Sequence, residues 1–457
     1  MDPSSTELEW IAASTALLRS PDDLELWKKL TQISLDKLTK ASPAQDVALA
    51  RQLYDLLLER FPLLYNYWIQ YAELELRIGN TKRAELVYRR GLGKLLYCVE
   101  LWVAFLEFKV STLTNNLDEL FETFEMARGK IGYHYHAYEF YRLYLDFLQH
   151  YGFEKQYYVL LRIVLEVPLY HYLYFFKKWF DTIARFNQLE GTEREHLLNM
   201  VVPASEMEKA KRFDNKQLVM YLKKYFVDMY IATQFRVFEV YSLEKELDRP
   251  YFDVAPLSKQ QLDAWEAYTT FVELRSTSEA AITLAYERAV VATSSYPQLW
   301  HQYLRWTKSR QRRMQILRRA MRYCRDPVFV VKLADEYAQR QQFLAARDVV
   351  VEAIAHSSDV PFMWYELLLL LEWSMSAKHK DAETYWRGIF EEIIATTNLD
   401  YWFIHMLNYS VSKDTKTAIL EHYAAEFGSR PLYQRARSTL DGPPATPTYD
   451  EMIAKYL

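Results

Sequence analysis

An arginine-rich stretch is the most chemically suggestive segment of this 457-residue chain. Residues 305–325 hold nine basic side chains and no acidic one. Guanidinium groups bind phosphates and carboxylates, so the stretch predicts a contact with RNA or with an acidic partner. The alternative is a solvated helix whose arginines pair with acids of neighbouring helices. The candidate contact residues are Arg312, Arg313, Arg318, Arg319 and Arg322.

Few other residues are grouped in a way that predicts chemistry. His134 and His136 lie two positions apart, but no carboxylate or cysteine cluster accompanies them, which favours surface or capping histidines over a metal site. Cys98 and Cys324 are the only cysteines, and we expect small buried hydrophobic residues in a reducing compartment. The motifs HExxH, GxxxxGK[ST], GxSxG and GxGxxG are absent. We therefore expect no enzyme, no cofactor, no metal and no small-molecule substrate.

Residues 133–175 contain eleven tyrosines and no tryptophan. Exposed tyrosines can stack on RNA bases. Tyrosines at helical spacing are more often buried between helices, with the hydroxyl at the edge of the core. The net charge of −4 also speaks against a protein that reads RNA directly, so any RNA contact is expected to be weak or indirect.

The composition indicates large helical interfaces. Glycine occurs 10 times, where average usage would give about 32, and this scarcity argues against phosphate-binding loops and turn-rich β folds. No apolar run approaches the ~18 residues of a membrane span, and the acidic N-terminus MDPSSTELEW lacks a signal-peptide pattern. These features predict a soluble intracellular protein with no membrane contact.

Tryptophans recur at intervals that indicate a repeat. Trp27, Trp68 and Trp102 form one series, Trp265 and Trp300 a second, and Trp364 and Trp402 a third. Within each series, neighbouring tryptophans are separated by roughly 35 to 40 positions, which is the period of two-helix solenoid repeats.

Each repeat has a recognisable pattern. Its first helix carries Trp, an aromatic residue three positions later and then Glu, as in Trp68, Tyr71 and Glu75, so that these side chains share one helical face. Its second helix carries Ala followed by an aromatic residue, as in RAELVYRRGL (83–92) and LAYERAV (284–290). The residues expected in the core of the repeats are Trp27, Trp68, Tyr71, Trp102, Trp265, Tyr268 and Trp300.

The pattern changes in the middle of the chain. Two further helix pairs are expected around 137–168 and 170–200, and residues 204–249 predict one long helix or two. The segment RPYFDVAPL (249–257) predicts an extended connector. We predict an N-terminal repeat block over 1–200, a helical connector over 201–258, a C-terminal repeat block over 259–440, and a proline-rich linker with a short tail over 441–457.

The repeat pattern resembles the HAT (half-a-tetratricopeptide) repeat, most closely at 68–92 and 265–290. The stretch RPYFDVAPL followed by QLDAWEAYTTFVE is similar to the pre-mRNA-processing factor thirty-nine family of the U1 snRNP. This resemblance implies an all-α superhelical solenoid of HAT repeats in two blocks, located in the nucleus. It implies a scaffold that organises peripheral U1 snRNP proteins for recognition of the 5′ splice site. The alternatives are a HAT scaffold of mRNA 3′-end cleavage and a solenoid that binds RNA directly.

The C-terminal block predicts a dimer. Its helices are apolar on more than one face, which is typical of an interface, and the resemblance implies a homodimer or a heterodimer with a paralogue. The tail YDEMIAKYL is expected to dock on the partner. The expected interface residues are Trp364, Leu368, Trp373, Trp402, Met406, Met452, Ile453 and Leu457.

Overall fold

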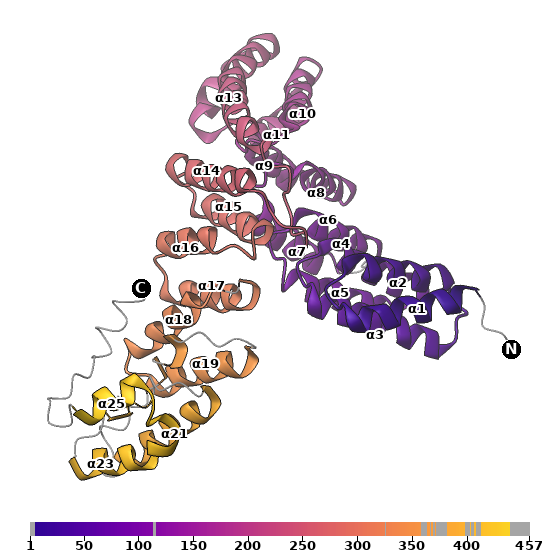
Figure 1. The fold of residues 1–457 in the computed structure, drawn as a ribbon. Coiled ribbons are helices and arrows are strands. Elements are labelled where there is room, and N and C mark those ends of the chain that lie inside the picture. Colours follow the sequence, from indigo (N-terminus) through magenta and orange to yellow (C-terminus); the bar gives the residue numbers. More distant parts are fainter. Residues whose placement is uncertain are drawn as a thin grey trace. The chain divides into compact units, whose positions relative to one another are not determined.

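Helices are the only regular secondary structure among the residues that the structure describes (Figure 1). The computed structural model describes residues 5–112, 116–324, 326–357, 382–397 and 413–438, together with 363–365, 367, 368, 371, 403, 406 and 407. None of these residues lies in a strand. The predicted all-α fold is therefore confirmed.

The chain divides into two compact units, residues 1–293 and 294–457. The predicted boundaries of the repeat blocks stay predictions. The first unit contains α1 (Ser5–Arg19), α2 (Leu24–Lys37), α3 (Ala44–Arg60), α4 (Tyr65–Ile78), α5 (Thr81–Leu92), α6 (Val99–Thr112), α7 (Leu117–Ile131), α8 (Tyr138–His150), α9 (Glu154–Leu165), α10 (Tyr172–Ala184), the 3₁₀ helix η1 (Arg185–Asn187), α11 (Gly191–Val201), the 3₁₀ helix η2 (Ala204–Glu206), α12 (Met207–Ala210), α13 (Asn215–Glu244), α14 (Lys259–Arg275) and α15 (Glu279–Ala292). The second unit contains α16 (Pro297–Trp306), α17 (Arg310–Tyr323), α18 (Val328–Ala338), α19 (Phe343–His356), α21 (Ala382–Thr397), α23 (Lys413–His422), α24 (Ala424–Phe427) and α25 (Pro431–Ser438).

The repeat tryptophans fix the turn before their own helix. The indole nitrogens of Trp27, Trp68, Trp102 and Trp300 each donate to the backbone carbonyl six residues earlier, at 2.7–3.0 Å. These side chains are at most 5% exposed. A buried indole N–H needs an acceptor, and the carbonyls of this turn have no partner within the helix that follows. One side chain therefore fills the core and satisfies the turn.

A glycine allows the two helices of one repeat to approach closely. A Cβ added at Gly91 on α5 would lie 2.9 Å from Cγ of Trp68 on α4. A methyl group there would push against a ring that the rest of the repeat holds in place. Gly91 therefore fits the contact with Trp68 as no larger residue can without a shift.

A single helix occupies most of the region where two were possible. α13 runs for 30 residues and begins at a capping box, in which the Gln217 backbone N–H donates to the Asp214 carboxylate at 2.7 Å and the Gln217 side chain accepts from the Asp214 N–H. η2 and α12 precede it. The segment 249–257 is non-helical, as predicted. It leads to α14 and α15, which belong to the first compact unit, and α15 packs against α7.

Candidate functional site

An arginine lies over the repeat tryptophan at the same position of three repeats. The guanidinium carbon lies 5.5 Å from the ring centroid for Arg90 over Trp68, 5.6 Å for Arg288 over Trp265, and 5.7 Å for Arg319 over Trp300. In each repeat the next residue along the second helix is small and buried: Gly91, Ala289 and Ala320. The pattern of Arg followed by Gly or Ala carries this signal in the sequence, although these arginines were not among the residues predicted for the repeat core.

The glutamate of the first helix is a second polar position inside the repeats of the first unit. The Glu75 side chain is fully buried, and its carboxylate accepts from Arg51 of α3 at 2.7 Å and lies 3.2 Å from Arg83 of α5. Glu273 accepts from the Tyr286 hydroxyl of α15. A buried carboxylate is tolerated only when it is paired and hydrogen-bonded. The glutamate therefore ties its helix to neighbouring helices.

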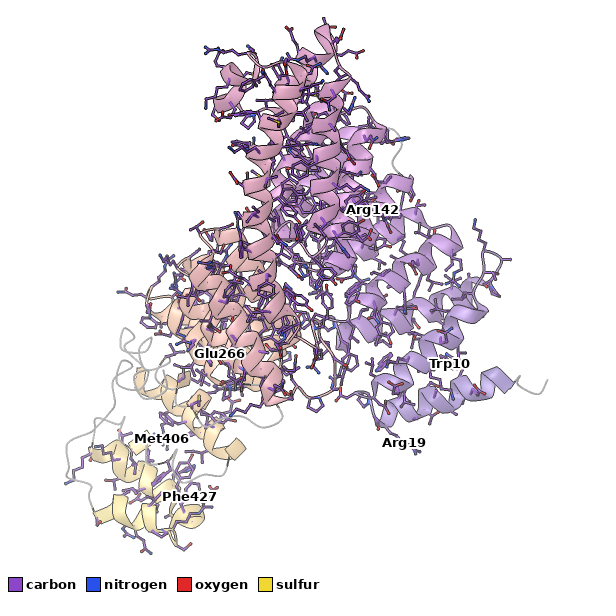
Figure 2. The ribbon with its side chains drawn as sticks, turned by 90° about the horizontal axis from the view of Figure 1, so that it is seen from above. Trp10, Arg19, Arg142, Glu266, Met406 and Phe427 are labelled. Carbon is purple, nitrogen blue, oxygen red and sulfur yellow. The ribbon has the colours of Figure 1, made fainter. Side chains whose placement is uncertain are left out.

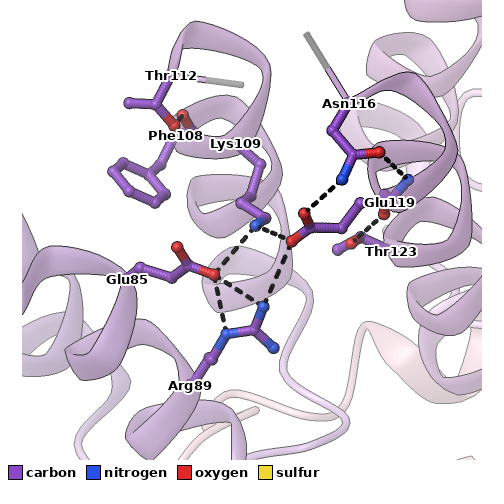
Figure 3. A network of polar contacts seen from close by, with 8 residues as sticks. All are labelled: Glu85, Arg89, Phe108, Lys109, Thr112, Asn116, Glu119 and Thr123. Carbon is purple, nitrogen blue, oxygen red and sulfur yellow. Dashed lines mark hydrogen bonds and ion pairs between the residues drawn. The ribbon is translucent and has the colours of Figure 1, made fainter. Parts of the chain in front are cut away.

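A buried lysine connects three consecutive helices (Figure 3). The Lys109 side chain on α6 is 1% exposed, and its ammonium lies 3.0 Å from Glu85 of α5 and 2.6 Å from Glu119 of α7. Arg89 also donates to Glu85, at 2.7 Å. Burial raises the pKa of Glu85, but the hydrogen bonds and charges of Lys109 and Arg89 outweigh it and lower the pKa. The network places two carboxylates around one buried cation.

A further buried polar network lies where the long helix and the connector meet the repeats. Arg288 donates to both carboxylate oxygens of Glu244, at 2.6 and 3.0 Å, and to the Tyr268 hydroxyl at 2.8 Å. The side chains of Arg288 and Glu244 are 3% and 5% exposed. Tyr251 of the connector donates to Glu100 of α6. Burial raises the pKa of Glu244, but the charge and hydrogen bonds of Arg288, together with His136 and Tyr268, outweigh burial and lower it.

The histidine pair lies in this same network. His134 is 3% exposed, and its Nδ1 accepts from the His136 backbone N–H at 3.1 Å. Burial, followed by the charge of Arg288, lowers the pKa of His134 well below its usual range. His134 is thus a buried turn-capping residue, and the expectation of a surface position holds only for His136, whose side chain is 53% exposed. Within the described ranges no three His, Cys, Asp or Glu side chains are grouped to hold a metal.

The arginines of α17 divide into three groups. Arg310 and Arg313 each donate to Glu336 of α18 at 2.8 Å, as the solvated-helix alternative expected. Arg319 lies over Trp300, and Arg312 is partly buried. The exposed group is Arg318, which donates to the Tyr337 hydroxyl, and Arg322, one turn further on. Of the five candidate contact residues, these two are exposed to a partner.

Four of the eleven tyrosines of 133–175 are buried in the core, five are half-buried and two are exposed. Tyr135, Tyr141 and Tyr144 are at most 3% exposed. The Tyr144 hydroxyl donates to Glu125 at 2.7 Å, and the Tyr141 hydroxyl donates to the Gly132 carbonyl at 2.9 Å. Buried rings bonded in this way are not available to stack on bases.

The predicted dimer residues that the structure describes lie inside the second unit. Trp364 and Leu368 are 8% exposed and Met406 is fully buried, in one hydrophobic cluster built from α18 to α25. Their apolar surface is thus used within the chain's own core. Cys98 and Cys324 are both buried as well. Trp373, Trp402, Met452, Ile453 and Leu457 lie outside the described residues.

This geometry defines a class of protein: the chain is an α-α repeat protein with a buried tryptophan in each of these repeats, covered by an arginine in three of them. Two family models match it, the PRP39 N-terminal HAT repeat over residues 12–181 and the PRP39 C-terminal HAT repeat over residues 239–367. The chain belongs to the PRP39 family of HAT-repeat proteins. The HAT solenoid expected from the sequence is thereby confirmed.

Several named proteins are similar to the chain. Pre-mRNA-processing factor 39 of Schizosaccharomyces pombe is 24% identical over 66% of this chain and 52% of its own length. The U1 small nuclear ribonucleoprotein component PRP42 of Saccharomyces cerevisiae is 27% identical over 63% of this chain and 55% of its own length. The human pre-mRNA-processing factor 39 is 24% identical over 57% of this chain and 43% of its own length. The chain thus spans about half the length of these relatives.

No helix in the described part of the chain combines the length and the apolar character that crossing a bilayer requires.

Proposed function

We propose that the chain is a non-catalytic scaffold of the U1 snRNP in pre-mRNA splicing, acting in the nucleus. The observation that carries this proposal is that both HAT-repeat models of one family match the chain in order, and that a relative is named as a U1 snRNP component. The scaffold organises peripheral proteins of the particle for recognition of the 5′ splice site. Its repeats act by geometry, because tied helix pairs present rigid surfaces to partners.

RNA contact is weak or indirect in this proposal. The buried tyrosines of α8 support it, as does the pairing of Arg310 and Arg313 with Glu336. The exposed Arg318 and Arg322 remain for an acidic partner or a phosphate. Isolated protein should bind single-stranded RNA weakly, and that binding should fall steeply as salt rises.

The proposed scaffold pairs with a second copy or with a paralogue through its C-terminal block. Light scattering should report about twice the 54.5 kDa of one chain, and deletion of residues 441–457 should shift the mass towards one copy. Replacing Trp364 is not a clean test, because that residue lies in the core of its own unit. A single-copy mass at tens of micromolar would exclude the homodimer and leave the paralogue to be tested.

Affinity purification of the tagged chain from nuclear extract tests the function itself. The expected result is co-purification of U1 snRNA and U1 proteins in stoichiometric amounts. Recovery of cleavage and polyadenylation subunits without U1 snRNA would contradict the proposal and support the 3′-end scaffold instead.

A further inference from the structure

The long helix α13 is apolar on two opposite faces. The helix packs within the first unit mainly against α10, η1, α14 and α9, and one face buries Leu218, Leu222 and Phe226. The opposite face, which we call the outer face of α13, exposes large apolar side chains along most of the helix. Its residues are Met220 (75% exposed), Val227 (40%), Ile231 (44%), Phe235 (68%), Phe238 (70%) and Tyr241 (46%). Figure 2 shows the side chains of the unit from above.

The spacing of these residues forms one continuous stripe. Met220, Val227, Ile231 and Phe238 follow one another at intervals of seven, four and seven, which places them on one side of a helix. At 1.5 Å per residue the stripe is about 32 Å long. A solvent-facing helix normally exposes polar residues on this side, so a stripe of this length indicates a surface that another element covers.

The charges beside the stripe are positive. Lys216, Lys223 and Lys224 are exposed and form no ion pair or hydrogen bond with any described residue. At about 100° per residue they lie within about 60° of the centre of the stripe. Asp228 is the only acidic residue of 215–231 and lies at the edge of the stripe, while Glu239 is engaged by Arg275 at 2.8 Å.

We propose that the outer face of α13 docks an amphipathic helix of a protein partner, whose apolar stripe is bordered by aspartate or glutamate where it meets Lys216–Lys224. Helices recognise grooves and faces through apolar anchors at such spacings, and complementary charge sets their direction. A second copy of the same face laid parallel to the first fits poorly, because its lysines would meet these lysines. The proposal rests on this surface alone and does not depend on membership of the U1 snRNP.

The test uses the full chain and two synthetic peptides. The acidic peptide is long enough to match the stripe, about 22 residues or six helical turns, with leucine at the seven-and-four spacing and glutamate beside it; its twin has lysine in place of every glutamate. Fluorescence anisotropy should show that the acidic peptide binds at least tenfold more tightly than the twin. The double variant Phe235→Ala/Phe238→Ala should weaken binding of the acidic peptide at least tenfold, and Lys223→Glu/Lys224→Glu should reverse the preference between the peptides. The matched control Leu86→Ala/Met126→Ala, which truncates exposed apolar residues on α5 and α7, should bind like the parent.

Circular dichroism and thermal melts verify that each variant is folded, which is expected because all replaced side chains are exposed. Equal binding of the two peptides, or unchanged binding by the phenylalanine variant, would overturn the proposal. A dimer in sedimentation that Phe235→Ala/Phe238→Ala abolishes would assign the face to a second copy instead. Binding to vesicles of phosphatidylcholine and phosphatidylserine that the same variant abolishes, without peptide binding, would assign it to an anionic membrane. Purification of U1 snRNA is a separate readout, so failure here leaves the proposed function standing.

Discussion

Arg90 and Arg288 occupy the same repeat position in two different environments. Each lies over the tryptophan of its own repeat, and each pairs with an acid from an earlier helix: Arg90 with Asp55 at 2.8 Å and Arg288 with Glu244 at 2.6 Å. The side chains of Arg90 and Asp55 are 43% and 39% exposed, whereas those of Arg288 and Glu244 are at most 5% exposed. The same repeat position therefore makes an exposed ion pair of little energetic weight among the regular repeats, at Arg90. Where the long helix α13 meets α14 and α15, which we call the junction, it makes a buried ion pair that the fold depends on, at Arg288.

The largest effect should come from the tryptophans themselves. Trp68→Ala and Trp265→Ala should each lower the free energy of unfolding by about 4 kcal/mol, because each removes a buried indole and leaves a cavity. Urea denaturation followed by circular dichroism measures the change. Similar losses would show that the cores of the two repeats are equally stabilising and that the repeats differ mainly at the arginine. Unfolding curves like that of the parent would show that the tryptophans are not core residues.

Replacing Arg288 and replacing Arg90 should lower the free energy of unfolding by unequal amounts. Arg288→Met should cost about 3 kcal/mol, because it leaves the Glu244 carboxylate buried without its partner. Arg90→Met should cost less than ~1 kcal/mol, because both partners there reach water. Equal losses of unfolding free energy in urea denaturation would contradict the conclusion that the buried arginine stabilises the fold more than the exposed one.

The next largest loss of stability should come from enlarging the small residue that follows the arginine. Gly91→Ala should cost about 2 kcal/mol, since the new methyl group meets the Trp68 ring. Gly129→Ala on α7 is the control, because a Cβ there meets nothing within 4 Å, and the gain in helix propensity should stabilise it slightly. A stabilising effect at Gly91 as well would mean that α4 and α5 separate easily.

The junction should also respond to pH through His134. Its folded pKa lies well below the ~6.5 of the unfolded chain, so the folded state binds fewer protons. The contribution of neutral His134 to the free energy of unfolding is therefore complete above about pH 6.5. It is lost as the pH falls towards the folded pKa, and the free energy of unfolding then changes by up to ~1.4 kcal/mol per pH unit. The unfolding free energy of His134→Gln should fall less between pH 7 and pH 5 than that of the parent. Parallel curves would show that His134 does not titrate on unfolding.

The smallest effect on stability should come from the exposed side of α17. Arg318→Glu/Arg322→Glu should change the unfolding free energy by less than ~0.5 kcal/mol. Arg310→Glu/Arg313→Glu should cost more, because it places two new acids against Glu336. Only the first variant should weaken a partner contact without unfolding the helix; the reverse order of stability losses would contradict the division of the arginines.

Much of the fold followed from local pattern. Tryptophan spacing and the i, i+3, i+7 pattern around Trp68 and Tyr71 were enough for the helix pairs and the all-α class, and the resemblance of residues 249–273 was enough for the family. The contacts between Arg288 and Glu244 could not be predicted from local pattern, because these residues are 44 positions apart and meet only through the path that the connector takes. Which side of α17 is exposed could not be predicted either, because the rotation of this helix about its axis is set by contacts with Glu336 and Trp300 on other helices.

The indole bond to the sixth preceding carbonyl has a consequence for how the repeat array can change in length. Successive tryptophans are unequally spaced along the chain, yet in four repeats the count from acceptor to indole is always six. An insertion or deletion between Pro62 and Trp68 would move the acceptor out of reach, whereas one between a second helix and the next acceptor would leave the bond intact. In the repeats of Trp27, Trp68, Trp102 and Trp300, the six positions before the tryptophan are therefore fixed in length, whereas Trp265 donates to the Arg249 carbonyl 16 residues earlier and is free of this constraint.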